Sequence, residues 1–236
     1  MDMMTSDFGY IAENLATVRA RLAAAAARGG HPTPTLIAVT KSASDDEVRA
    51  LLSFGVDAIA ENRPQMFTAR AAIADEVKAT AKIHLIGSLQ TNKVKYVVGR
   101  AAMIQSLDSL RLADEIERIA AKREVTVPVL IEVNSGREEQ KGGLLPEEVP
   151  AFAEALKGYP HLLVAGLMTM GPDCDDPEDY RPYFRLVRAL SEELTAAGLL
   201  PPSPALSMGM SGSYEVAAEE GATHVRVGRT LFHKHG

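Results

Sequence analysis

The feature that most constrains this chain is a regular alternation of short apolar segments with segments of helical periodicity. Eight segments are predicted as strands, most of them apolar, at 36–39, 56–60, 83–86, 102–107, 127–133, 162–167, 205–208 and 223–227. Segment 127–133 is almost continuously apolar, which is typical of a strand covered on both faces in a parallel sheet. Eight strand–helix units predict an α/β fold, a single closed (β/α)8 barrel of the TIM type. An open doubly wound sheet is the alternative, but no Gly-x-Gly-x-x-Gly turn follows the first segment.

One further helix precedes the eight units. Apolar residues recur at helical spacing at Ile11, Leu15, Val18 and Leu22, and Gly29-Gly30 ends the pattern. We expect residues 1–30 to form an N-terminal helix that packs on the barrel. Hydrophobic residues make up 46% of the chain and charged residues 24%, so one large core is available. We therefore expect one domain over 1–236 and no second domain.

Charge and cysteine content exclude several classes of function. The net charge of −6 argues against a nucleic-acid-binding face. Cys174 is the single cysteine, so neither an intramolecular disulfide nor a cysteine metal cluster can form. No group of His, Asp and Glu has the spacing of metal ligands. The first residues lack a basic leader, and no apolar run reaches the length of a membrane span, so we expect a cytoplasmic protein.

Lys41 is the main candidate for chemistry. It follows segment 36–39 directly after Thr40, and Ser44 with Glu47 forms a capping-box pattern that starts the next helix. Lys41 therefore lies at the carboxyl end of a strand, where the ligands of parallel α/β folds bind. A lysine held against apolar walls loses its proton more easily, which suits Schiff-base formation with an aldehyde. A solvated loop lysine is the alternative.

Two glycine-containing turns point to a phosphate group at the same mouth. Loops after the seventh and eighth strands are the usual phosphate site of a TIM barrel. Segment 207–211 runs into a helix N-terminus, where free backbone N–H groups attract a dianion. Gly228 lets the backbone on the opposite side approach closely. Together with Lys41, these turns predict a phosphorylated aldehyde as ligand. Helix caps and ordinary turns are the alternative interpretation.

A family resemblance runs through nearly the whole chain. Seven segments carry it, in this order: 38–41 (Ala-Val-Thr-Lys), 61–62 (Glu-Asn), 86–93 (Ile-Gly-Ser-Leu-Gln-Thr-Asn-Lys), 133–134 (Val-Asn) with Lys141, 166–168 (Gly-Leu-Met), 206–211 (Leu-Ser-Met-Gly-Met-Ser) and 225–228 (Val-Arg-Val-Gly). The chain resembles the pyridoxal phosphate homeostasis protein family, single-domain barrels related to the N-terminal domain of alanine racemase. Ile83, Ser88 and Ala60 stand where that family usually shows other residues.

The resemblance implies a pyridoxal 5′-phosphate (PLP) cofactor on a barrel like that of fold type III PLP proteins. By the resemblance, Lys41 forms a Schiff base with PLP and Arg226 faces the pyridine nitrogen. The phosphate is held by Ser211 and by the backbone of Met210, Gly228 and Arg229. The ring is lined by Asn62, Met168 and Ser207.

Arg226 bears on whether the cofactor is used for turnover. An arginine keeps its proton and can only donate a hydrogen bond, so a pyridine nitrogen facing it stays unprotonated. The cofactor is then a poor electron sink. The resemblance thus implies a protein that holds and releases PLP for PLP homeostasis without substantial turnover of its own. PLP-dependent apo-enzymes are candidate recipients, and a monomer or weak homodimer is expected. Alternatively, Arg226 pairs with a carboxylate and only braces the barrel.

Two enzyme alternatives remain. A PLP-dependent amino-acid racemase needs a base on each face of its substrate. Alanine racemases take the second base from an added domain and a partner subunit, whereas eight residues follow Gly228 here. A cofactor-free Schiff-base aldolase on the same barrel would share Lys41 but would not need Arg226.

Overall fold

The strands form a closed barrel. The computed structural model describes residues 7–234, and in it all eight strands pair in parallel in sequence order, with the last strand closing on the first. The strands are β1 (Thr35–Val39), β2 (Ala58–Glu61), β3 (Lys82–Leu85), β4 (Met103–Leu107), β5 (Val127–Glu132), β6 (Leu162–Met168), β7 (Ala205–Ser207) and β8 (His224–Val227). The predicted (β/α)8 barrel is confirmed, and the doubly wound alternative is wrong.

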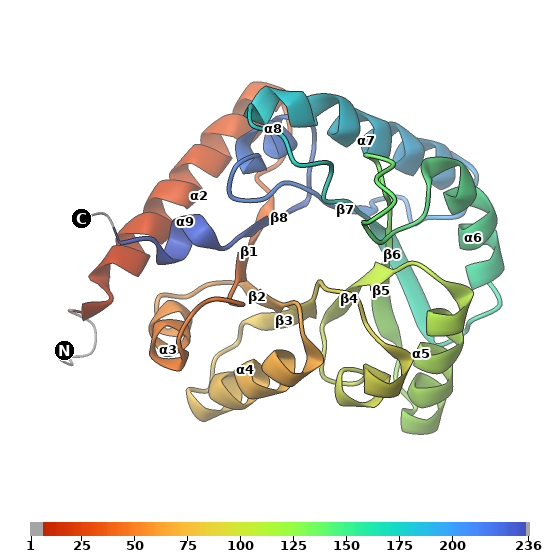
Figure 1. Cartoon of the computed structure of the whole chain (residues 1–236), viewed down its shortest axis with the longest axis horizontal. Helices are drawn as coiled ribbons and strands as arrows, with labels where there is room; N and C mark the ends of the chain where they lie inside the picture. Colours follow the sequence, from red (N-terminus) through yellow and green to blue (C-terminus); the bar gives the residue numbers. More distant parts are fainter. Residues whose placement is uncertain (1–6, 235–236) are drawn as a thin grey trace.

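Helices cover the outside of this barrel (Figure 1). The α-helices are α2 (Gly9–Gly29), α3 (Asp45–Ser53), α4 (Pro64–Glu76), α5 (Leu110–Arg123), α6 (Val149–Leu156), α7 (Arg181–Ala196), α8 (Tyr214–Glu219) and α9 (Arg229–Phe232). The 3-10 helices are η1 (Thr91–Tyr96), η2 (Pro146–Glu148) and η3 (Pro177–Tyr180). Within residues 7–234, no helix combines the length and apolar character needed to cross a membrane.

The N-terminal helix α2 packs on the end of the chain. It lies against α8 and α9 (Figure 1). Its buried Asn14 donates from Nδ2 to the carbonyl oxygens of Leu231, at 3.1 Å, and His233, at 2.9 Å. These two hydrogen bonds tie the segment after β8 to the first helix.

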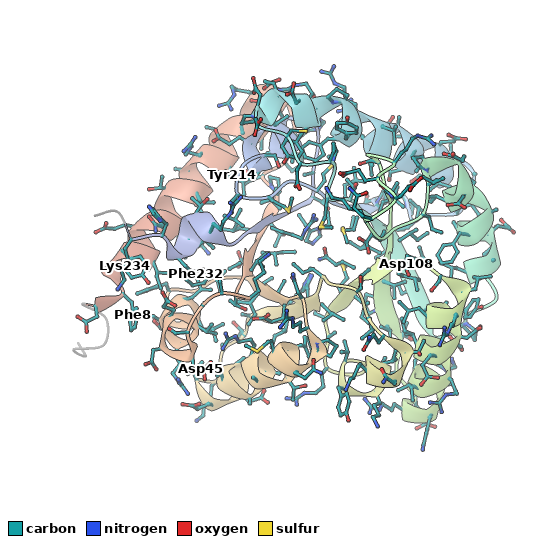
Figure 2. All side chains as sticks on the ribbon, in the orientation of Figure 1. Phe8, Asp45, Asp108, Tyr214, Phe232 and Lys234 are labelled. Carbon is teal, nitrogen blue, oxygen red and sulfur yellow. The ribbon has the colours of Figure 1, made fainter. Side chains whose placement is uncertain are left out.

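The core has two parts. The larger part lies between the strands and the helices and holds most of the buried apolar side chains. A separate small cluster of Ile37, Ala58 and Ala60, with Ile86 packed against it, comes from strands β1 and β2 and the end of β3. Side chains also project into the space that the strands enclose (Figure 2), and those from β4, β7 and β8 are polar. The barrel interior is therefore apolar on one side and hydrogen-bonded on the other.

Candidate functional site

Three segments meet at the carboxyl end of the barrel. Gly228 lies close to the end of β1, and a Cβ there would lie 3.0 Å from the carbonyl oxygen of Val39, a tight contact. The backbone N–H of Gly228 donates to Ser211 Oγ at 3.3 Å. The two turns predicted to hold phosphate are thus in contact with each other and with the strand that precedes Lys41.

The turn after β7 presents backbone donors. Gly209 has a φ of +87°, a left-handed conformation that favours glycine. The N–H of Met210 donates to Ser213 Oγ at 3.2 Å. The N–H groups of Ser211 and Gly212 make no hydrogen bond within the described residues. Ser211 is half-buried and Gly212 is exposed, so the turn has donors to offer to an anion.

Arg226 is buried and held by neutral groups. Its residue is 3% exposed, NH1 donates to Ser207 Oγ at 2.7 Å, and NH2 donates to the carbonyl oxygen of Thr169 at 2.8 Å. Burial lowers the pKa of the guanidinium to about 10, so it stays charged at neutral pH, and the nearby Glu132 carboxylate opposes this shift. No carboxylate in residues 7–234 lies within ion-pair distance of Arg226. The bracing ion pair considered for Arg226 is therefore not formed.

A chain of hydrogen bonds runs from Arg226 across the barrel. Ser207 Oγ, which accepts from Arg226, donates to Gln105 Oε1 at 2.7 Å. Gln105 Nε2 in turn donates to His84 Nδ1 at 2.9 Å. The chain joins β8, β7, β4 and β3, and all of these side chains are buried. Ser207 is therefore fixed in orientation by two partners.

Glu132 and Met168 lie beside Ser207 and Arg226 at the carboxyl end of the barrel. Met168, 1% exposed, is the register partner of both Glu132 on β5 and Ser207 on β7. Burial raises the pKa of Glu132 to about 7, and the Asp108 carboxylate adds to the shift while Arg226 opposes it. An acidic group that titrates near neutrality thus lies close to Arg226.

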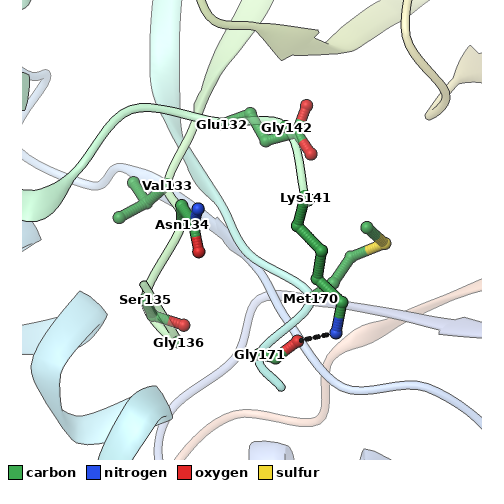
Figure 3. A pocket seen from close by; sticks show the side chains of 9 residues that line it. All are labelled: Glu132, Val133, Asn134, Ser135, Gly136, Lys141, Gly142, Met170 and Gly171. Atoms are coloured by element: carbon green, nitrogen blue, oxygen red, sulfur yellow. Dashed lines mark hydrogen bonds between the residues drawn. The ribbon is translucent and has the colours of Figure 1, made fainter. Parts of the chain in front are cut away.

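Figure 3 shows Glu132 at one edge of a pocket with Lys141 and Met170. The pocket has a volume of about 10 Å³, which is close to the minimum for one water molecule. Lys141 Nζ donates to the carbonyl oxygen of Gly171 at 3.1 Å and forms an ion pair of 2.6 Å with Glu138. The pocket is therefore too small for an organic ligand in this conformation.

Replacing Glu132 with Gln should change how stability depends on pH. The folded-state pKa of Glu132 is raised, so its favourable contribution is present below the ordinary value of 4.5 and is lost as pH rises through 7. Relative to the wild type, the Glu132→Gln variant should gain about 2 kcal/mol in unfolding free energy between pH 5 and pH 8. Urea unfolding at both pH values measures this. A difference in unfolding free energy between the variant and the wild type that is the same at pH 5 and pH 8 would contradict a raised pKa for Glu132.

Lys41 lies in a turn directly after β1. It is exposed, and its amine has no hydrogen bond or ion pair within residues 7–234. β1 ends at Val39, and a turn in which the Ala43 N–H donates to the Thr40 carbonyl oxygen leads to α3. The predicted capping box is confirmed: Ser44 Oγ accepts from the Glu47 N–H at 3.2 Å, and Glu47 Oε2 accepts from the Ser44 N–H at 2.7 Å.

A buried ionic network fixes the turn that carries Lys41. Arg70, 1% exposed, donates from NH2 to the Ala43 carbonyl oxygen at 2.6 Å and from Nε to Glu61 Oε1 at 3.2 Å. Glu61 Oε1 also accepts from Thr40 Oγ1 at 2.6 Å, and Asp45 is a further partner of Arg70. Both ends of the turn are thus held from α4 and β2.

Among residues 7–234, the side chains of Asn62 and Arg229 are not hydrogen-bonded to the rest of the site. Asn62 is half-buried after β2, and its backbone lies so close to Gly87 that a side chain at 87 would clash with it. Arg229 is exposed at the first position of α9. No hydrogen bond between the described residues joins either side chain to the rest of the site.

Sequence reasoning missed several residues of this region. Glu132 is the one polar residue of β5, and Gln105 is a long polar side chain in the mostly apolar strand β4, so both could have been marked as interior groups. Thr169, Glu61 and Arg70 contribute through contacts that no local pattern indicates. Among residues 7–234, no group of three or more His, Cys, Asp or Glu side chains is arranged to hold a metal ion.

Comparison with known proteins defines the class. The family model of the alanine racemase N-terminal domain matches residues 12–235. Alanine racemase of Clostridium difficile shares the fold with a TM-score of 0.77 at 18% identity, over 96% of this chain and 57% of that one.

Two relatives are similar over nearly their whole length. The pyridoxal phosphate homeostasis protein of Aquifex aeolicus is 42% identical over 93% of this chain and 96% of its own. The structure of PipY from Synechococcus elongatus with PLP bound has a TM-score of 0.82 and 30% identity, over 94% of this chain and all (100%) of that one. The chain therefore belongs to the alanine racemase N-terminal domain family and, within it, to the pyridoxal phosphate homeostasis proteins.

Proposed function

We propose that this protein binds PLP at the carboxyl end of its barrel and serves PLP homeostasis in the cytoplasm. It holds PLP covalently through Lys41 and releases it, without substantial turnover of its own. The observation that carries the proposal is the buried Arg226, held by Ser207 and Thr169 beside the contact between Ser211 and Gly228. The PLP-bound structure of the Synechococcus relative supports it.

The donor groups present fit PLP. A phosphate dianion needs several N–H partners, and the unpaired N–H groups of Ser211 and Gly212 can supply two. In the proposed site, the backbone of Met210, Gly228 and Arg229 completes the phosphate contacts. PLP itself supplies an aldehyde that condenses reversibly with an amine and a pyridine ring that can accept electrons. The exposed amine of Lys41, which has no partner among residues 7–234, is available to that aldehyde.

The other side chains orient the ring. Arg226 donates to the pyridine nitrogen, and Asn62, Met168 and Ser207 line the ring. The pKa of Arg226 of about 10 keeps it charged at pH 7, so it cannot hand a proton to the nitrogen. A ring in this state stabilises a carbanion poorly, which favours a carrier over a racemase. The proposed recipients are PLP-dependent apo-enzymes, and the protein is proposed to be a monomer or weak homodimer.

The test is covalent capture. After incubation with PLP and borohydride reduction, the wild type should gain one pyridoxyl group on the peptide that contains Lys41. Lys41→Ala should lose at least 90% of this label at an equal PLP concentration, since no other amine is placed at β1. Lys122→Ala, which removes an exposed lysine in the last turn of α5, is the matched control and should label as the wild type does.

Peptide mass spectrometry and the absorbance change on reduction give two independent measurements. Equal labelling of Lys41→Ala and wild type would overturn the assignment of Lys41. Fast, saturable loss of optical rotation from L-alanine, dependent on Lys41, would favour the racemase over the carrier.

A further inference from the structure

A second cavity opens at the opposite, amino-terminal end of the barrel. It has a volume of about 590 Å³, within the range of small-molecule sites. Its lining includes His84 and the first residues of five strands: Thr35 of β1, Ala58 of β2, Lys82 of β3, Met103 of β4 and His224 of β8. None of these residues belongs to the proposed PLP site.

Both histidines present N–H donors to this cavity. Gln105 Nε2 can only donate, so His84 Nδ1 accepts and the neutral ring carries its proton on Nε2. His224 Nδ1 lies 2.8 Å from Thr223 Oγ1, a hydroxyl that also accepts from the Leu206 N–H at 2.8 Å. When the hydroxyl donates to Nδ1, the His224 proton is likewise on Nε2. The two rings are 6.2 Å apart, centre to centre.

The local electrostatics favour an anion. Burial lowers the pKa of His84 to about 4, with the charges of His224 and Lys82 adding to the shift. The pKa of His224 is lowered to about 4 by burial, Lys82 and Arg226. Both rings thus lie within reach of the positive charge of Lys82, and His224 also of that of Arg226. Asp57, the acidic residue in the lining, is largely exposed and forms an ion pair of 3.9 Å with Arg19.

We propose that this cavity is an anion site that takes a small molecule with a phosphate group, bound by Lys82, His84 and His224. The ammonium and the two imidazole N–H groups converge on the cavity from β3 and β8, on either side of β1 and β2. Thr35, the register partner of His224, adds a hydroxyl. A bound phosphate group makes protonation of both rings easier, so binding strengthens as pH falls toward 5.

The test uses inorganic phosphate and the imidazole resonances of the full chain. In NMR titrations from pH 7 to pH 4, 20 mM phosphate should raise the pKa of both His84 and His224 relative to 20 mM chloride. Lys82→Met, a change at an exposed strand start, should weaken phosphate binding at least tenfold. Lys122→Met, which removes an exposed lysine from α5, should leave it unchanged.

Three results would overturn the site: no movement of either ring's pKa, equal weakening in both lysine variants, or no weakening in Lys82→Met. A parallel titration with succinate separates phosphate from carboxylate ligands, and stronger binding of succinate would contradict the phosphate class. The site stands independently of the PLP proposal, because Lys41→Ala should bind phosphate here as the wild type does.

Discussion

Replacing Arg70 with Met is expected to lower the unfolding free energy by about 3–5 kcal/mol, the usual cost of removing one partner from a buried ion pair. The variant leaves the Glu61 carboxylate, 0% exposed, with Thr40 Oγ1 as its remaining hydrogen-bond partner. One carboxylate oxygen, Glu61 Oε2, already has no hydrogen-bond partner in the described part of the chain. The Ala43 carbonyl oxygen also loses its donor. Urea unfolding followed by circular dichroism measures the loss.

A double variant separates charge from packing. The double variant Arg70→Met with Glu61→Leu contains no unpaired buried carboxylate at this position. Its unfolding free energy should therefore be at least about 1 kcal/mol higher than that of Arg70→Met. A loss below about 1 kcal/mol for Arg70→Met, or a double variant less stable than the single one, would contradict the role of this pair. If Lys41 captures PLP as proposed, Arg70→Met should also slow that capture, since the turn from Thr40 to Ala43 loses its support.

Acid should destabilise the fold through the two barrel histidines. Their folded-state pKa values of about 4 lie below the ordinary 6.5, so the unfolded chain binds more protons between these values. The contribution of the two histidines to the unfolding free energy is present above pH 6.5 and is lost as pH falls through 4. Each histidine should cost about 2–3 kcal/mol between pH 7 and pH 4, and together about 5 kcal/mol.

Neutral replacements isolate this effect. His84→Asn combined with His224→Asn should lose about 5 kcal/mol less than the wild type over the same pH range. His31→Asn, outside the barrel against Gly221, should follow the wild type. Urea unfolding in chloride buffer without phosphate gives the comparison. Equal acid sensitivity of the wild type and the double variant would show that the two rings are not buried as described.

The sequence was sufficient for features that depend on neighbouring residues. The eight strands follow from apolar runs, the start of α3 from the Ser44–Glu47 capping box, and the turn at Gly228 from its position after β8. The barrel follows because eight parallel strands with covering helices have few ways to close. The contact between Ser211 and Gly228 was anticipated as two turns at one mouth, and the structure places them in hydrogen-bond contact.

What the sequence could not supply depends on distant residues. Ser207 and Gln105 are 102 residues apart, and Arg226 and Thr169 are 57 apart, so no local pattern pairs them. The exposure of Lys41 depends on where β1 stops and how Arg70 holds the turn. The raised pKa of Glu132 depends on its burial inside the barrel and on Asp108, which follows another strand, while Arg226 on β8 opposes the shift.

The hydrogen-bonded chain inside the barrel also affects how the molecule assembles. The chain crosses the barrel through the bond between Gln105 and Ser207, with His84 on one side and Arg226 on the other. A fragment ending after β4 would leave Gln105 Oε1 without its donor, Ser207 Oγ, and one starting at β5 would leave the Ser207 hydroxyl without its acceptor. Neither half can satisfy its own interior, so intermediate forms gain little stability. We therefore expect the protein to unfold as one cooperative unit. Stable folding should require closure of the barrel.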